Sequence, residues 1–203
     1  LYGAAVSMVQ EDLKKLIAFS SVSHMGYVLL GAAALTGVGM QGAVLQMFTH
    51  GTITGLLFLM VGLVYDRTHT RIIGEMGGLG ARMPIIAVVF VVAGLASLGL
   101  PGMSGFVAEF LVFVGAFPVW QLATILAAFG IVITAGYLLW MLERVFMGPL
   151  PQRWSGLGDA GRLETFTIGV MVAVIVGVGV YPSILTDVIK VGVVPMAQRL
   201  AGL

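Results

Sequence analysis

Apolar runs about as long as a membrane is thick follow one another along this chain. A helix needs about 20 apolar residues to cross the hydrocarbon core of a bilayer. Charged residues make up only 9% of the sequence, whereas an ordinary soluble domain carries about 25% to keep its surface in water. We therefore expect an all-α fold, a polytopic bundle of transmembrane helices. After a short apolar stub, about five full spans are expected, at residues 14–35, 42–65, 84–117, 119–147 and 163–181.

The third apolar run is too long for one straight crossing. It is interrupted by the segment Gly99–Gly105, which reads GLPGMSG. Proline removes a backbone hydrogen bond, and glycine tolerates unwound backbone. We expect one span broken at this segment, with Pro101, Gly102 and Gly105 forming the break between helices at about 84–98 and 105–117.

Basic residues indicate how the spans are oriented, because positively charged loops tend to stay on the inner side of a membrane. Only Lys190 and Arg199 fall on the side opposite to the other eight basic residues, so we expect the C-terminus to lie outside. The polar segment 66–75 is expected to be a solvated loop. Eight basic residues fall on alternate connections, all on one side: Lys14, Lys15, Arg67, Arg71, Arg82, Arg144, Arg153 and Arg162.

Two parts of the chain differ in composition. Residues 1–182 form the predicted transmembrane part. Residues 183–203 mix charged and apolar side chains, which is typical of an amphipathic or interfacial helix. The sequence opens inside an apolar stretch, Leu1–Val9, without an initiator Met, and we interpret it as a fragment of a longer protein.

Charge and cysteine content exclude several kinds of site. The formal net charge is only +1, so the sequence gives no basic field for nucleic acid. Cysteine is absent, which rules out disulfides, thiolate metal sites and iron–sulfur ligation. We expect neither a metal site nor a bound cofactor on this chain. Any redox chemistry linked to it would take place on another chain.

Polar residues inside the first two spans fall on one face of each predicted helix. In the first span, Ser20, His24 and Tyr27 are spaced i, i+4, i+7; in the second, Gln46, His50 and Thr54 are spaced i, i+4, i+8. A short turn, Thr36–Gln41, makes the two helices antiparallel neighbours, so the two histidines can face each other and relay protons. The predicted polar axis also includes Ser23 and Thr49.

The broken span contributes Glu109, four residues after the break. Broken helices at membrane depth often line ion paths, and a carboxyl group there can take up and release protons. Structural roles stay open: either histidine could hydrogen-bond between helices, and Glu109 could bind backbone amides freed by the break. Most of the serines and threonines could bond their own i−4 carbonyls.

Three motifs, in this order, resemble the antiporter-like membrane subunits of NADH:quinone oxidoreductase. They are EDLKKLIAFSSVSHMGY at 11–27, QMFTHG at 46–51 and LPGMSGFVAEF at 100–110. The resemblance covers nearly the whole chain and weakens after about residue 150. Within the family the match is closest to the subunit M branch, because Thr54 and Gly55 stand where other branches usually carry lysine before the LLFL stretch.

The resemblance implies a function and a set of partners. The chain would belong to a proton-translocating subunit of the bacterial inner membrane, with NADH, FMN, iron–sulfur clusters and quinone on partner subunits of the membrane complex. His24 and His50 would lie on a hydrated proton path, with Glu109 as its terminal residue toward the outer side. A multisubunit Na⁺/H⁺ antiporter, a membrane-bound hydrogenase and a purely structural role remain as alternatives.

Overall fold

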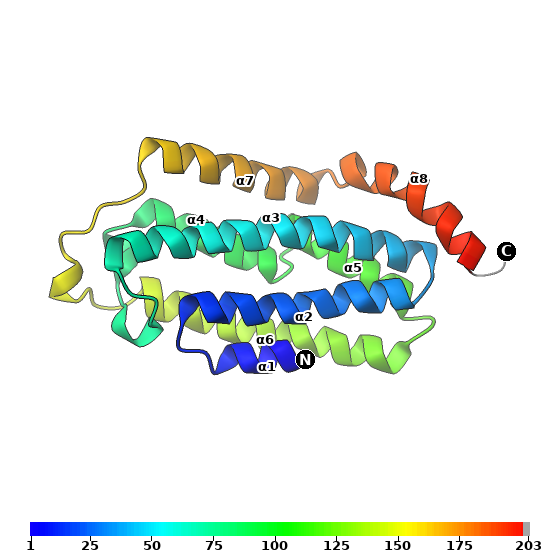
Figure 1. The fold of residues 1–203 in the computed structure, drawn as a ribbon, viewed down its shortest axis with the longest axis horizontal. Coiled ribbons are helices and arrows are strands. Elements are labelled where there is room, and N and C mark those ends of the chain that lie inside the picture. Colours follow the sequence, from blue (N-terminus) through cyan, green and yellow to red (C-terminus); the bar gives the residue numbers. More distant parts are fainter. Residues whose placement is uncertain (201–203) are drawn as a thin grey trace.

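Residues 1–200 are described by a computed structural model in which the chain folds into a layered bundle of helices (Figure 1). This part of the chain holds no β-strand, only an isolated bridge between Asp12 and Ile72. Short 3₁₀ turns lie at Ile73–Glu75, Leu79–Ala81 and Gln152–Trp154. The helices are α1 (Tyr2–Met8), α2 (Leu13–Ala33), α3 (Gly37–Thr68), α4 (Pro84–Ser97), α5 (Ser104–Ala116), α6 (Gln121–Phe146), α7 (Arg162–Val180) and α8 (Ser183–Leu200).

The five predicted spans are confirmed. Four helices, α2, α3, α6 and α7, are long and apolar enough to cross a membrane. The shorter α4 and α5 together make the fifth, broken span. Helix α3 begins at Gly37, five residues before the predicted start, because the Thr36 hydroxyl caps it by accepting a hydrogen bond from the Gly39 amide. The connection from α2 is therefore shorter than expected.

The break between α4 and α5 lies where the sequence predicts it. Helix α4 ends at Ser97 and α5 begins at Ser104. Gly99 and Gly102 have φ of 72° and 93°, a left-handed conformation that favours glycine. Gly105, predicted to end the break, lies in the first turn of α5, which begins one residue earlier at Ser104. A Cβ at Gly105 would overlap the carbonyl oxygen of Ala96, so glycine is needed there for close packing.

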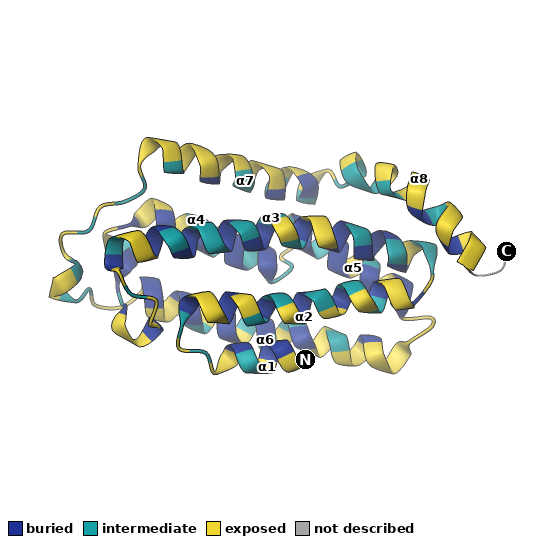
Figure 2. Cartoon of the chain, viewed as in Figure 1, coloured by how far each residue is buried: buried dark blue, intermediate teal, exposed yellow. Residues whose placement is uncertain are grey.

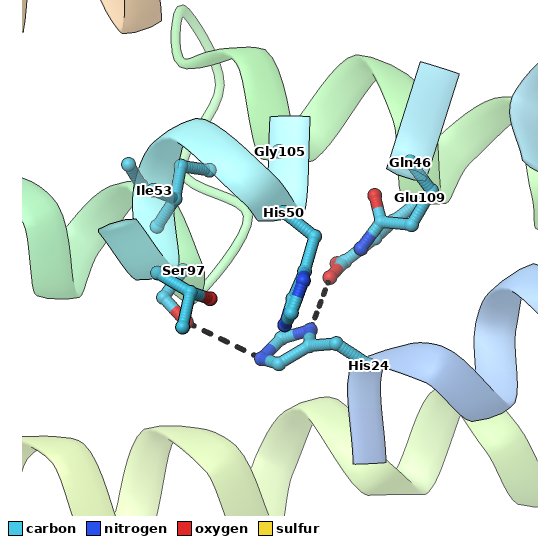
Figure 3. Close-up of a pocket in the computed structure, with 9 residues that line it drawn as sticks. His24, Gln46, His50, Ile53, Ser97, Gly105 and Glu109 are labelled. Carbon is cyan, nitrogen blue, oxygen red and sulfur yellow. Dashed lines mark hydrogen bonds and ion pairs between the residues drawn. The ribbon is translucent and has the colours of Figure 1, made fainter. Parts of the chain in front are cut away.

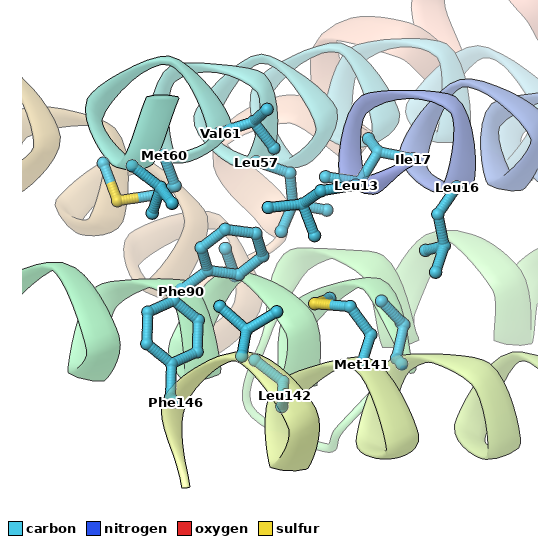
Figure 4. Packing of buried hydrophobic residues seen from close by; sticks show 14 of the residues in the cluster. Leu13, Leu16, Ile17, Leu57, Met60, Val61, Phe90, Met141, Leu142 and Phe146 are labelled. Carbon is cyan, nitrogen blue, oxygen red and sulfur yellow. The ribbon is translucent and has the colours of Figure 1, made fainter. Parts of the chain in front are cut away.

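Buried apolar side chains from α1, α2, α3, α4, α6 and α7 form the main core of the bundle, part of which Figure 4 shows. The rings of Phe90 and Phe146 pack with centroids 5.2 Å apart and join α4 to α6. Helix α7 exposes most of its surface (Figure 2), as expected of a span that packs against lipid. The core holds α2, α3, α4 and α6 in register through Leu13, Leu16, Ile17, Leu57, Met60, Val61, Met141 and Leu142.

The eight basic residues lie in three connections or in the adjoining helix turns, and these connections gather at one end of the bundle (Figure 1). The α1–α2, α3–α4 and α6–α7 connections lie there, whereas the α2–α3 and α5–α6 connections lie at the opposite end. The alternation read from the sequence is therefore confirmed. That the basic end faces the inner side of the membrane stays a prediction.

The predicted C-terminal tail contains helix α8, which packs against α3. Val193 and Ala197 are its buried residues, while Asp187 and Lys190 are exposed. Residues 201–203 of the predicted tail lie outside the described residues. An interfacial position for α8 remains a prediction.

The expectation of a solvated loop over residues 66–75 is wrong for its first residues. Arg67 lies in α3 and is partly buried. Its guanidinium donates hydrogen bonds to the backbone oxygens of Gly158 and Asp159, at 3.0 Å each, and to the Glu164 carboxylate at 2.6 Å. The Asp159 carboxylate in turn accepts from the backbone amide of Ile85 at the start of α4. Through these hydrogen bonds, Arg67 connects α7 and the segment before it to α3.

Replacing this guanidinium should loosen α7. We expect Arg67→Gln to lower the free energy of unfolding by about 2 kcal/mol, because carbonyl and carboxylate groups lose a charged donor. Thermal unfolding in detergent would measure the change. Arg82→Gln, at an exposed position of the same end, is the control and should change stability by less than about 0.5 kcal/mol. Equal stability of the two variants would contradict the fastening role.

Candidate proton-transfer site at the broken helix

Ionisable and polar side chains from α2, α3, α4 and α5 meet beside the helix break (Figure 3). His24 comes from α2, His50 from α3 and Glu109 from α5, and Ser97 is the last residue of α4. His24 lies ten residues beyond Lys14, which is about 15 Å along a helix. That is half of a hydrocarbon core of about 30 Å, so with Lys14 at the membrane edge we expect the site to lie near the middle of the membrane.

His24 is bound through both ring nitrogens. Its Nδ1 lies 3.2 Å from Glu109 Oε1, and its Nε2 lies 3.2 Å from Ser97 Oγ (Figure 3). His24 and Glu109 are each only 4% exposed. With a proton on Nδ1, the ring donates a hydrogen bond to the carboxylate and accepts one from the serine hydroxyl. With the proton on Nε2 instead, the ring faces Glu109 with a lone pair, and the carboxyl group must then carry a second proton to donate to Nδ1.

When it holds one further proton, the histidine–glutamate pair can therefore exist in two arrangements: an imidazolium beside a carboxylate, or a neutral imidazole with its proton on Nε2 beside a carboxylic acid. A buried charge at membrane depth is costly unless it is paired. Both arrangements keep the summed charge of the two side chains low. His24 Nδ1 and the Glu109 carboxylate are therefore a donor and an acceptor at hydrogen-bonding distance, between which a proton can be transferred.

His50 extends this pair toward α3. Its ring centroid lies 5.8 Å from that of His24, at an interplanar angle of 43°. Within residues 1–200, the buried Nε2 of His50 has no hydrogen-bond partner. The facing histidine stripes predicted from the sequence are thus confirmed as geometry.

A small cavity of about 10 Å³ lies between the histidines and the broken helix. One water molecule needs about 10–15 Å³ and several polar partners. The cavity wall includes Gln46 and Thr54 as well as the ionisable groups, so its size and polarity suit a single water. Its lining also contains Ile53, Ala96, Ser97 and Gly105.

Three predicted members of the polar axis lie away from this cavity. The Ser20 hydroxyl donates to the Ile17 carbonyl at 2.8 Å, within its own helix. The Thr49 hydroxyl donates to Gln46, at 3.4 Å to the backbone oxygen and 3.3 Å to Oε1. Ser23 lines a different cavity, of about 330 Å³, beside Tyr27 and α6. Ser23 and Thr49 lie on the flanks of their stripes, whereas Ser20 lies on its stripe but one turn before His24, short of the cavity.

Two residues at the break shape the site without having been predicted to do so. Ser97, which holds His24 Nε2, is a lone hydroxyl at the end of an apolar helix, four residues before Pro101. A Cβ at Gly99 would lie 2.8 Å from Glu109 Oε2. The break therefore makes room for the carboxylate as well as ending α4. A polar residue next to a predicted break is the signal that could have identified Ser97.

No cluster of three or more His, Cys, Asp or Glu residues suited to a metal ion occurs in the described part of the chain. The site instead offers two imidazoles, one carboxylate, two hydroxyls and one side-chain amide. These groups are suited to hydrogen bonding and proton exchange.

Comparison with known proteins identifies the family. The family model described as NADH:quinone oxidoreductase/Mrp antiporter, transmembrane, matches residues 1–134. The chain belongs to this family. It is 46% identical over 198 residues to NAD(P)H-quinone oxidoreductase chain 4 1 of Thermosynechococcus vestitus, covering 93% of this chain and 37% of that protein. It is 44% identical over 200 residues to NADH-quinone oxidoreductase subunit M of Rhodobacter capsulatus, covering 98% and 39%.

Solved structures agree with the family assignment. Respiratory complex I from Thermus thermophilus contains a chain with 32% identity and a TM-score of 0.90, covering all of this chain and 42% of that one. The archaeal membrane-bound sulfane sulfur reductase matches at 30% identity and a TM-score of 0.87, covering 92% and 31%. The Mrp complex from Dietzia sp. matches at 21% identity and 0.84, covering 94% and 44%, which shows the shared fold alone.

This family member is a membrane protein, and the solved structures named above that match it at 30% identity or more are respiratory membrane complexes. The chain spans about 40% of the length of the curated relatives it matches. The resemblance to the antiporter-like subunits, including the subunit M branch, is confirmed.

Proposed function

We propose that this chain forms part of a proton-translocating membrane subunit of an NADH:quinone oxidoreductase. The observation that carries the proposal is the buried contact between His24 Nδ1 and Glu109 Oε1, 3.2 Å long, at the centre of the bundle. An ionisable pair at this depth costs free energy, so its presence favours a function in charge transfer over simple packing. The relatives named as oxidoreductase subunits support the same activity.

In this proposal a proton passes between His50, His24 and Glu109. A water in the small cavity takes the proton from His50 and passes it to the Ser97 hydroxyl, which gives its own proton to His24 Nε2. His24 then exchanges the proton directly with Glu109, which releases it toward the outer side. Ser97 keeps the His24 ring oriented by its hydrogen bond to Nε2. The steps need only shifts of protons along hydrogen bonds.

Electron transfer would take place elsewhere in the complex. NADH, FMN, iron–sulfur clusters and quinone would be held by partner subunits, and this chain would hold no cofactor. The subunit would be a multi-pass protein of the bacterial inner membrane, with its basic end inside and its C-terminus outside.

Exchange of sodium for protons is the second candidate, because the family model also covers Mrp antiporters. Thr54 and Gly55, at the place where the antiporter branch usually carries lysine, favour the oxidoreductase. A membrane-bound hydrogenase subunit would use the same proton site with another electron donor.

The source of energy distinguishes these activities. In inverted vesicles that contain the native complex, we expect NADH oxidation with added quinone to acidify the lumen, and a sodium gradient without NADH to leave its pH unchanged. Acidification driven by sodium alone would establish the antiporter instead. Proton movement that depends on hydrogen or reduced ferredoxin, with no response to NADH, would favour a hydrogenase-type complex.

A further inference from the structure

A groove separate from the proton site opens between α2 and α3 at the basic end of the bundle. It encloses about 450 Å³. Two cationic side chains, Lys14 and Arg71, and the aromatic ring of Tyr65 line it together with an apolar wall. None of these residues lines the proton-transfer site, so the function proposed for that site does not account for the groove.

The charged part of the groove carries an excess of positive charge. Arg71 lies over the Tyr65 ring, with its Cζ 5.3 Å from the centroid, and its Nε is 3.7 Å from the Asp12 carboxylate. The other Asp12 oxygen caps α2 by accepting from the amides of Lys14 and Lys15. Lys14 itself has no ion-pair partner within residues 1–200. Two cations against one carboxylate leave one net positive charge facing the groove.

The apolar wall follows one face of α3. Phe58, Val61, Gly62 and Tyr65 are spaced i, i+3, i+4, i+7, so they form a continuous strip along the helix. The strip runs over seven residues, which is about 10 Å. Gly62 has open space where a side chain would be. The groove therefore continues from the charged end toward the membrane interior along an apolar surface.

We propose that this groove binds an anionic phospholipid, with the phosphate between Lys14 and Arg71 and one acyl chain along Phe58–Tyr65. The cations lie at the end of the bundle where basic connections gather, which is where phospholipid headgroups meet a membrane protein. Lysine and arginine bind phosphate by charge-assisted hydrogen bonds. A transmembrane helix of a neighbouring protein would leave these cations facing its apolar surface, at a cost that a phosphate avoids.

Photo-crosslinking tests the site in the native complex. The complex is reconstituted into phosphatidylcholine nanodiscs that contain a small fraction of phosphatidylglycerol with a diazirine on its acyl chain. We expect cross-links on the peptide that holds Phe58–Tyr65. The double variant Lys14→Gln/Arg71→Gln should reduce their yield about tenfold, whereas Lys14→Arg/Arg71→Lys should retain it. The control Lys15→Gln/Arg82→Gln removes two exposed cations of the same end and should leave the yield unchanged.

Competition on the unmodified protein makes the test independent of how the variants fold. Unlabelled phosphatidylglycerol should suppress the cross-link at lower concentration than phosphatidylcholine does. Equal suppression by the two lipids would overturn the proposal, as would a cross-link yield unaffected by Lys14→Gln/Arg71→Gln. Attachment of the Phe58–Tyr65 strip to another protein segment by a bifunctional reagent would also overturn it, because a protein would then fill the groove.

Discussion

A native complex carrying Glu109→Gln is expected to lose proton translocation while keeping its fold. Glutamine has nearly the same shape as glutamate, and its side-chain oxygen can still accept the hydrogen bond from His24 Nδ1. The amide cannot take up a proton at neutral pH. We expect the translocation rate to fall about 100-fold or more, which is the usual contribution of a positioned proton-transfer group.

The effect is expected to be large because Glu109 is the only carboxylate in the lining of the site cavity. His24 has no second acidic partner within the described residues. When the pair loses its carboxyl group, a proton on His24 has nowhere to move along the hydrogen bond. Coupled NADH:quinone turnover should slow in step with proton movement, and this is measured in the same inverted vesicles.

Replacing Glu109 by the shorter aspartate distinguishes a role in proton transfer from a role in packing. Glu109→Asp keeps a titratable carboxyl group but withdraws it from His24, so we expect a partial rate between those of the unmodified protein and Glu109→Gln. Glu143→Gln removes an exposed acid at the end of α6 and serves as the matched control, with unchanged rates. If Glu109→Gln also translocates protons at the unmodified rate, Glu109 is a structural acid and the proposed path is wrong.

The spans, the break and the facing histidines could be predicted from the sequence because each depends on local information. Apolar run length determines where a helix can cross a membrane. Pro101 and its glycines mark the interruption, and helical spacing places His24 and His50 on stripes. A short connection then makes α2 and α3 neighbours, so the two stripes meet.

The contacts of His24 could not be predicted, because they depend on how helices distant in sequence rotate and approach one another. Glu109 is 85 residues from His24, and Ser97 is 73 residues away. Nothing local fixes which face of α5 turns toward α2. The fastening of α7 by Arg67 escaped prediction for the same reason, since its partners lie 91 to 97 residues along the chain.

The site also depends on close backbone packing between α3, which carries His50, and α5, which carries Glu109. A Cβ on Gly115 would overlap the backbone nitrogen and Cα of Gly39. The Thr36 hydroxyl donates to the Gly115 carbonyl at 2.8 Å and holds the crossing together. Backbone atoms cannot move aside as a flexible side chain can. The two helices can therefore be this close only if residue 115 is glycine.

Gly115→Val should reduce the amount of folded protein in the membrane. Overpacking usually costs about 1–3 kcal/mol, and here the backbone of Gly39 cannot yield, so we expect the upper end of that range or more. A protein with a stability of about 5–15 kcal/mol loses much of its margin. The amount of protease-resistant protein in the membrane and its thermal unfolding in detergent would measure the loss.

The same substitution at an open position controls for valine in a transmembrane helix. Gly169 is exposed on α7, and no atom lies within 4 Å of the place that a Cβ would take, so Gly169→Val should leave folding intact. Gly115→Ala, with the smallest possible Cβ, should fold less stably than Gly169→Val but better than Gly115→Val. This order follows from contact with the Gly39 backbone. If the three variants were equally stable, α3 and α5 could separate without loss, and the close crossing would not be what holds His50 near Glu109.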